Sequence, residues 1–271
     1  MTYSNYWSKT NYLAPIPYVV NSYITEYDIS KANINILYYY GVINDEMYNM
    51  LYNCDKMQRE VYVGKMERSH PEISDIKANG IKEFRHKFFS ANNIQDSELL
   101  SIKNDAIYVI GKKCQFTKFD NVEFRESNVY TTYMRLPRLE LYYSFDPITN
   151  NEVLDIKGIK DAALELHREY MVSFLCDVCY KLQNSSVEEA IKTNNELLEA
   201  ILTRQIDVRF FREFNGESMY RMSSRFSTFF INNAVQSDID YLDPACNIEI
   251  LRCISSILSD IYLSKFNKNK R

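Results

Sequence analysis

One stretch constrains the fold of this chain more than any other. A strand-forming run from Tyr18 to Tyr27 ends at Asp28 and passes directly into a helical pattern. The run predicts a buried strand, and Ile34 and Leu37 fall on one face of the helix that follows. A carboxylate at the end of a core strand, beside backbone carbonyls, is a place where a hard cation can be held. The stretch therefore predicts a strand–helix unit with a candidate metal ligand at its junction.

A second stretch supplies a partner for this carboxylate. From Leu99 to Ile110, apolar residues flank Asn104-Asp105, which is typical of two paired strands joined by a tight turn. If this hairpin lies beside the strand that ends at Asp28, the two carboxylates converge at one edge of a sheet. Two divalent ions about 3.5–4 Å apart could there clamp an in-line displacement at phosphorus. Either aspartate alone has an ordinary structural role, as a helix cap or a turn residue, so the prediction of phosphoryl or nucleotidyl transfer depends on both.

These stretches resemble the palm domain of family A and family B DNA polymerases. Asp28, Ser30 and the helical run through Leu37 are similar to motif A, and the predicted hairpin over 99–110 is similar to motif C. Val153 to Ile159, with its Lys-Gly-Ile turn, resembles the segment that leads from palm to thumb in family B. The resemblance covers roughly residues 18 to 160 and depends mainly on the order of the three motifs. It implies an α+β fold, with a polymerase-palm-like antiparallel sheet and packed helices, followed by an all-helical, thumb-like C-terminal domain.

The resemblance also implies a site. Asp28 and Asp105 would be the catalytic carboxylates and would hold Mg²⁺ or Mn²⁺ with the backbone carbonyl of Ile29. Nucleotide contacts would come from Ser30, Asn33, Arg59 and Lys65, and contacts to a primer–template from Lys103, Lys112, Lys113 and Lys157. The chain is short for a complete replicative polymerase, so the resemblance implies a minimal or divergent viral enzyme, or one piece of a split polymerase that works with a second subunit.

The chain departs from the family pattern in three places. Its turn reads Asn104-Asp105-Ala106 and has one carboxylate, where family A has His-Asp-Glu and family B has Asp-x-Asp. Asn33 takes the place of the Glu or Tyr that closes against the sugar 2′ position, and no fingers motif lies between the two aspartates. These departures keep a second hypothesis open: a catalytically decayed palm that binds nucleic acid or serves in the virion. A third is a helical assembly protein with a Tyr-rich surface.

Composition does not decide between these hypotheses. The net charge is −4, so there is no global basic footprint for nucleic acid. The 22 Tyr are compatible with a Tyr-rich contact surface. The basic residues that follow the predicted hairpin form either a local channel or a solvated sheet face balanced by nearby acids. They are Lys103, Lys112, Lys113, Lys118, Arg125, Arg135 and Arg138.

The pattern along the chain predicts two domains. Strand signals run from 99 to 159, and helical signals follow over about 160–182, 186–204, 216–235 and 246–266. We expect a palm-like domain over 1–158, with reduced fingers at about 41–70, and a helical domain over 159–271. No apolar run approaches the length of a membrane span, and the polar, aromatic N-terminus does not resemble a signal peptide. The expected location is the cytoplasm, which is the host cell's if the protein is viral.

Overall fold

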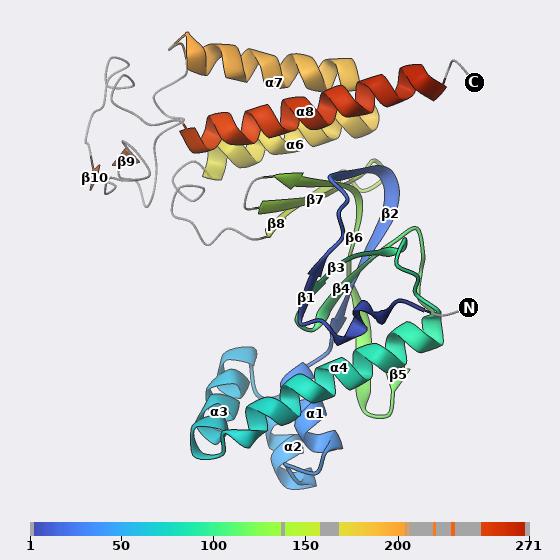
Figure 1. Ribbon diagram of the computed structural model, residues 1–271. Helices are drawn as coiled ribbons and strands as arrows, with labels where there is room; N and C mark the ends of the chain where they lie inside the picture. The colour runs from blue at the N-terminus through green and yellow to red at the C-terminus, as the bar shows by residue number, and fades with distance from the viewer. Residues whose placement is uncertain are drawn as a thin grey trace. The chain divides into compact units, whose positions relative to one another are not determined.

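The computed structural model describes residues 3–136, 139–157, 168–203, 205, 219–220, 229–230 and 245–268. The chain is α+β, and its main sheet has eight strands (Figure 1). The strand order is β1-β3-β4-β2-β6-β7-β8, with β5 paired to β6. This confirms the predicted α+β class and the antiparallel sheet.

Most elements lie where the sequence pattern predicts them. The strands are β1 (Asn11–Leu13), β2 (Tyr18–Ile29), β3 (Leu99–Lys103), β4 (Ala106–Ile110), β5 (Lys118–Phe119), β6 (Val122–Leu136), β7 (Leu139–Asp146), β8 (Asn151–Lys157), β9 (Met219–Tyr220) and β10 (Phe229–Phe230). The helices are α1 (Ala32–Tyr39), α2 (Asp45–Asn53), α3 (Lys56–Ser69), α4 (Glu72–Asn92), α6 (Arg168–Asn184), α7 (Val187–Leu202) and α8 (Ala245–Lys268), preceded by a 3₁₀ turn η1 (Asn5–Ser8).

The chain divides into two compact units, Met1–Pro15 with Ser22–Val129 and Ile16–Asn21 with Tyr130–Arg271. Strands β2 and β6 each contribute residues to both units. The predicted domain boundary near Gly158 lies outside the described residues. Each unit has its own apolar core, so the two are considered separately below.

In the first unit, one face of the sheet is covered by α4. Tyr27 and Ile29 of β2 and Ile107 of β4 are buried against Phe84 and Phe88 of this helix. Burying an apolar side chain of this size stabilises the fold by about 1.5–3 kcal/mol. Because successive side chains on a strand point to opposite faces, residue 28 points to the face that α4 does not cover.

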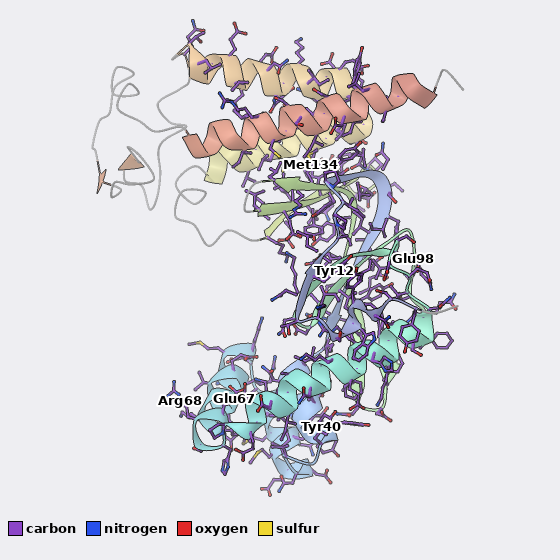
Figure 2. The ribbon with its side chains drawn as sticks, in the orientation of Figure 1. Tyr12, Tyr40, Glu67, Arg68, Glu98 and Met134 are labelled. Atoms are coloured by element: carbon purple, nitrogen blue, oxygen red, sulfur yellow. The ribbon has the colours of Figure 1, made fainter. Side chains whose placement is uncertain are left out.

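Helices α1, α2 and α3 form a small cluster with the N-terminal half of α4. Ile34 and Leu37 are buried there, as the spacing predicted. Helix α1 approaches α4 closely at Gly80, where an added Cβ would lie 2.4 Å from Cγ2 of Ile36. An ion pair of 2.7 Å between Lys77 and Glu67, which is labelled in Figure 2, joins α4 to α3. The cluster thus places α3 near the end of β2.

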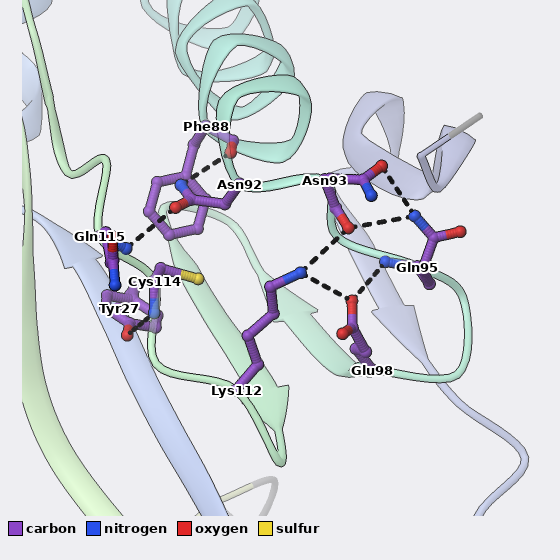
Figure 3. Close-up of polar contacts among 9 residues, drawn as sticks. All are labelled: Tyr27, Phe88, Asn92, Asn93, Gln95, Glu98, Lys112, Cys114 and Gln115. Atoms are coloured by element: carbon purple, nitrogen blue, oxygen red, sulfur yellow. Dashed lines mark hydrogen bonds and ion pairs between the residues drawn. The ribbon is translucent and has the colours of Figure 1, made fainter. Parts of the chain in front are cut away.

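The C-terminal end of α4 is held by hydrogen bonds of Asn92, and Figure 3 shows those to Phe88 and Gln115. The buried Asn92 amide donates to the carbonyls of Phe88 and Phe116, at 3.0 and 2.7 Å. Its oxygen accepts the backbone N–H groups of Gln115 and Phe116, both at 3.0 Å. All four hydrogen-bonding positions of this side chain are therefore used.

The open end of the β3–β4 hairpin lies beside this helix end. Glu98 accepts the N–H of Gln95 at 2.8 Å and the Lys112 ammonium at 3.3 Å (Figure 3). Lys112 also donates to the carbonyl of Asn93 at 3.1 Å. The charges at this end of the hairpin thus compensate one another.

In the second unit, α6, α7 and α8 form a core with β7. Met134, which is labelled in Figure 2, is buried in it with Leu175, Leu251 and Leu258. The helices predicted over about 160–182, 186–204 and 246–266 correspond to α6, α7 and α8, and residues 160–167 are not described. None of the helices in the described ranges is long and apolar enough to cross a membrane.

Two sequence predictions differ from the structure. Within the strand signals of 99–159, the separate segments at 121–124 and 129–133 belong to one continuous strand, β6, which runs on through the exposed and half-buried residues between them. The helix expected over about 216–235 is wrong at its described residues, where Met219–Tyr220 and Phe229–Phe230 pair as two short antiparallel strands. Aromatic residues such as these favour extended backbone.

Candidate functional site

The end of β2 lies beside the turn of the β3–β4 hairpin. Strand β2 pairs antiparallel with β4, and Asp28 is the register partner of Ala106. Strand β4 pairs in turn with β3, and Lys103 is also a partner of Ala106. Asp105 therefore stands in the turn next to the strand end that carries Asp28. This confirms the predicted hairpin and its position beside β2.

The turn is held from two sides. Asn104 has a φ of 54°, in the left-handed region that Asn tolerates better than most residues. Its N–H donates to the carbonyl of Thr10 at 2.9 Å. Its own carbonyl accepts Nη1 of the buried Arg85 at 2.7 Å. These contacts fix the backbone conformation of the turn that contains Asp105.

A pocket with a volume of about 210 Å³ lies at this junction. Six of the residues predicted from sequence line it: Asp28, Ile29, Ser30, Asn33, Arg59 and Asp105. Six further residues complete the lining: Lys31, Ala32, Ile34, Lys56, Glu60 and Arg125. The pocket thus brings together side chains from β2, α1, α3, the hairpin turn and β6.

The charge of Asp28 acts on the ionisation of Asp105. Burial raises the pKa of Asp105 above its ordinary value, and the negative charge of Asp28 raises it further. Lys56 acts in the opposite direction, while Glu60 adds to the increase. The ionised form of Asp105 is therefore destabilised unless a positive charge comes close.

Asp28 has a cationic partner of its own. Nη2 of Arg125 lies 3.3 Å from Oδ2 of Asp28. The Arg125 side chain is 63% exposed and that of Asp28 is 26% exposed. An ion pair as accessible as this is worth about 1 kcal/mol or less, so a competing cation can displace the guanidinium.

Two of the other three cations in the pocket donate to carbonyls at the C-terminal end of α2. Lys31 donates to the carbonyl of Tyr52 at 2.8 Å, and Nη1 of Arg59 donates to the carbonyl of Cys54 at 2.5 Å. The Asn33 amide donates to both carboxylate oxygens of Glu60, at 3.0 and 2.9 Å. The contact between Asn33 and Glu60 therefore joins the start of α1 to α3.

Five of the predicted site residues do not line this pocket. Lys65 is exposed on α3, and Lys103 ends β3 on the hairpin. Three others pair with carboxylates: Lys112 with Glu98 at 3.3 Å, Lys113 with Glu126 at 3.1 Å, and Lys157 with Asp155 at 2.6 Å. Lys157 belongs to the second unit.

Sequence reasoning missed two lining residues, Lys56 and Glu60, and the buried Arg85 behind the turn, for which a signal existed. Lys56, Arg59 and Glu60 have the spacing that brings side chains to one face of a helix, so a pocket facing Arg59 would include all three. Arg85 stands among the apolar residues of α4, where a charge on a buried face indicates a specific partner. Arg125 gave no such signal, since its approach to Asp28 depends on how β6 pairs with β2.

Asp28 and Asp105 are the two side chains of this pocket predicted from sequence to ligate a hard cation. Mg²⁺ commonly takes one or two carboxylates and completes its shell with water and phosphate oxygens. Asp28 and Asp105 supply such a pair, and their mutual repulsion is relieved by a cation between them. Among the residues that the structure describes, no group of three or more His, Cys, Asp or Glu side chains is placed to hold a metal ion.

The fold and this pocket define an α+β protein with paired carboxylates and several cations at one end of a strand and hairpin. Residues 1–259 match a protein family described as the Bacteriophage PBS1 gene 130 protein, so the chain belongs to this family of phage proteins. Comparison with curated proteins gives no match.

Proposed function

We propose that this protein is a metal-dependent nucleotidyltransferase of the polymerase-palm type that extends a nucleic-acid primer. The observation that supports this most is the meeting of Asp28 and Asp105 in one pocket, from opposite sides of a β2–β4 pairing. The order of the two motifs in the sequence does not by itself require Asp28 and Asp105 to converge. In the proposal, the sheet of the first unit corresponds to a palm, and α2 and α3 take the place of reduced fingers.

The size and charge of the pocket suit the reacting end of a nucleotide. Pockets that enclose a whole small ligand have volumes of roughly 300–1,000 Å³, and this one is smaller, at about 210 Å³. It therefore accommodates phosphate groups and leaves the nucleoside outside. Lys31, Lys56 and Arg59 would bind the triphosphate oxygens, because both ammonium and guanidinium groups donate well to phosphate.

Asp28 and Asp105 would hold Mg²⁺ or Mn²⁺, with the carbonyl of Ile29 as a further oxygen ligand. When bound, such ions lower the pKa of a primer 3′-hydroxyl and neutralise charge on the triphosphate. Ser30 and Asn33 would border the incoming nucleotide at the start of α1. Lys103, which ends β3 beside the turn, would contact the primer backbone.

A second function is favoured by the ion pair between Arg125 and Asp28. If this pair is permanent, the carboxylate is neutralised by the chain itself and the protein is a palm-like nucleic-acid-binding or virion-associated protein without catalysis. The single carboxylate of the turn, between Asn104 and Ala106, fits this function as well. The two candidates differ in whether the pocket binds a divalent cation.

The family match supplies the biological setting of the proposal. A phage protein that extends nucleic acid would act in the cytoplasm of the infected cell. Its partners would be a primer–template and, if the chain is one piece of a split enzyme, a second polymerase subunit.

Primer extension tests the proposal directly. A labelled primer–template is incubated with Mn²⁺ and mixed nucleotides, and wild type is compared with Asp28→Asn and Asp105→Asn, which keep the size of the side chain. Asp75→Asn, at an exposed position in the first turn of α4, is the matched control. We expect extension by wild type and by the control and its loss in both pocket variants.

Mn²⁺ binding, followed by the electron paramagnetic resonance of the free ion, separates the two functions. Cation binding that both pocket variants lose supports the enzyme. No extension and no cation binding by a folded wild-type chain would reject the enzyme in favour of the non-catalytic protein.

A further inference from the structure

A charged side chain lies on the apolar face of α4. Arg85 is only 1% exposed and sits in the helix between Phe84 and Phe88, both fully buried. It is the largest of the fully buried side chains in the described ranges. Burying a guanidinium is costly, and an apolar side chain of similar volume at such a position is often neutral or stabilising. Packing alone therefore does not explain an arginine here.

The guanidinium reaches one particular point of the backbone. Nη1 donates at 2.7 Å to the carbonyl of Asn104, which lies in the left-handed region. Nε of Arg85 has no hydrogen-bond partner among the described residues. The side chain thus gives up part of its hydrogen-bonding capacity while making this contact to the hairpin turn.

The next residue along the turn is Asp105. Burial lowers the pKa of Arg85 to about 10, and the charge of Asp105 acts to raise it. Arg85 therefore remains protonated at neutral pH and attracts the carboxylate that Asp28 repels. The geometric contact to Asn104 and this attraction act on the same short segment.

We propose that Arg85 is a positioning residue for the Asp28–Asp105 site: from the α4 side of the sheet it fixes the hairpin turn so that the Asp105 carboxylate faces the pocket. It acts through the carbonyl of Asn104 and does not line the pocket. The expected effect of Arg85 on cation binding rests on the proposed function. Its effect on the turn does not.

The test compares wild type with Arg85→Lys and Arg85→Met. Methionine removes the charge and the hydrogen bond and keeps much of the volume. Lysine keeps a charge but loses the planar guanidinium whose Nη1 reaches the carbonyl. Lys82→Met, three residues earlier on α4, is the matched control for loss of a positive charge from the same helix.

Two readouts are measured on the full chain, after thermal unfolding has shown that each variant is folded. Hydrogen–deuterium exchange of the amides over residues 103–106 reports on the turn, and Mn²⁺ affinity reports on the site. Replacing a residue that orients a metal ligand typically lowers metal affinity by about 10–100-fold. We expect a loss of about tenfold for Arg85→Met, a smaller loss of about threefold for Arg85→Lys, and faster turn exchange in the same order.

The outcomes are distinguishable. If the turn amides of folded Arg85→Met and Arg85→Lys exchange at the wild-type rate, the proposal is overturned. It is also overturned if both variants bind Mn²⁺ with wild-type affinity. If Arg85→Met does not fold, Arg85→Lys decides alone, since equality with wild type in either readout rejects a positioning role. If wild type binds no Mn²⁺, the proposed enzyme function fails, and turn exchange still decides the role of Arg85.

Discussion

The β3–β4 hairpin has an acidic side chain at each end, and the two lie in different electrostatic environments. At the open end, Glu98 accepts a backbone N–H and the Lys112 ammonium. At the turn end, Asp105 is partly buried beside a second carboxylate, and its pKa is raised as a result. The first arrangement stabilises the fold by itself. The second leaves the ionised form of Asp105 destabilised, and carboxylates perturbed in this way are concentrated at functional sites.

The largest expected effect is a loss of stability beside the open end of the hairpin, with no change in binding at the turn end. Asn92→Ala removes an amide whose four hydrogen-bonding positions are all used, and it leaves the N–H groups of Gln115 and Phe116 without that acceptor. Leaving a buried group unsatisfied costs about 1–3 kcal/mol, and because these N–H groups are only partly buried, we expect a loss of about 2 kcal/mol. Urea unfolding measures it, and Mn²⁺ affinity at the turn end should not change.

Asn53→Ala is the matched control. Asn53 is exposed and makes a similar hydrogen bond, from its amide to the carbonyl of Asn49 four residues earlier. We expect a change of about 0.5 kcal/mol or less. An equal loss in both variants would mean that the network around Asn92 has no special role in stability.

The second prediction is a substitution that weakens Mn²⁺ binding and at the same time stabilises the fold. Asp105→Asn removes one of the two crowded carboxylates, so we expect a loss of at least about tenfold in Mn²⁺ affinity, which is about 1.4 kcal/mol. The folded-state pKa of Asp105 is raised, so ionisation weakens the fold as pH rises through that pKa. Asp105→Asn should therefore be more stable than wild type at pH 7.

The pH dependence of this difference checks its cause. It should shrink as pH falls and vanish near and below the ordinary Asp pKa of about 3.9, where the wild-type carboxyl is protonated in both states. Urea unfolding at several pH values measures it. A variant that is less stable than wild type at pH 7 would mean that Asp105 is favourably paired in the native protein.

The comparison of the two ends also explains what the sequence could predict. The strand to Asp28, the helix with Ile34 and Leu37, and the hairpin around Asp105 have strong periodic or turn signals, because each depends on neighbours in the sequence. Their convergence followed from one further step, the pairing of β2 with the hairpin. That step was right because an apolar strand and an apolar hairpin bury most when they share one sheet.

Charge compensation was not predictable in the same way. The sequence shows Lys112 and Lys113 as basic residues after the hairpin and leaves open whether nearby acids balance them, and the structure pairs them with Glu98 and Glu126. The role of Arg125 beside Asp28 depends likewise on the register of β6. Pairings between distant strands decide which cations are available to a ligand, and single-sequence patterns carry little information about them.

A third prediction tests how firmly Arg125 occupies the turn end. Arg125→Gln removes the guanidinium that competes with a cation for Asp28. Since an exposed pair of this kind is worth about 1 kcal/mol or less, we expect Mn²⁺ to bind about threefold more tightly. Titration calorimetry measures the change. Unchanged affinity would indicate that Arg125 does not compete with a cation for Asp28, and then the non-catalytic function would lose its main support.

The smallest effect is expected at the open end. Lysine contacts to phosphate each contribute about one unit to the dependence of log affinity on log salt. Lys112 is already paired with Glu98, so Lys112→Gln should lower the slope for primer–template binding by much less than one unit and change affinity less than about twofold. Lys103→Gln, at the turn end of the same hairpin, should lower the slope by about one unit if this lysine contacts the primer backbone as proposed. A full unit lost at Lys112 would show that this lysine leaves Glu98 when nucleic acid binds, and the open end would then be a binding surface as well.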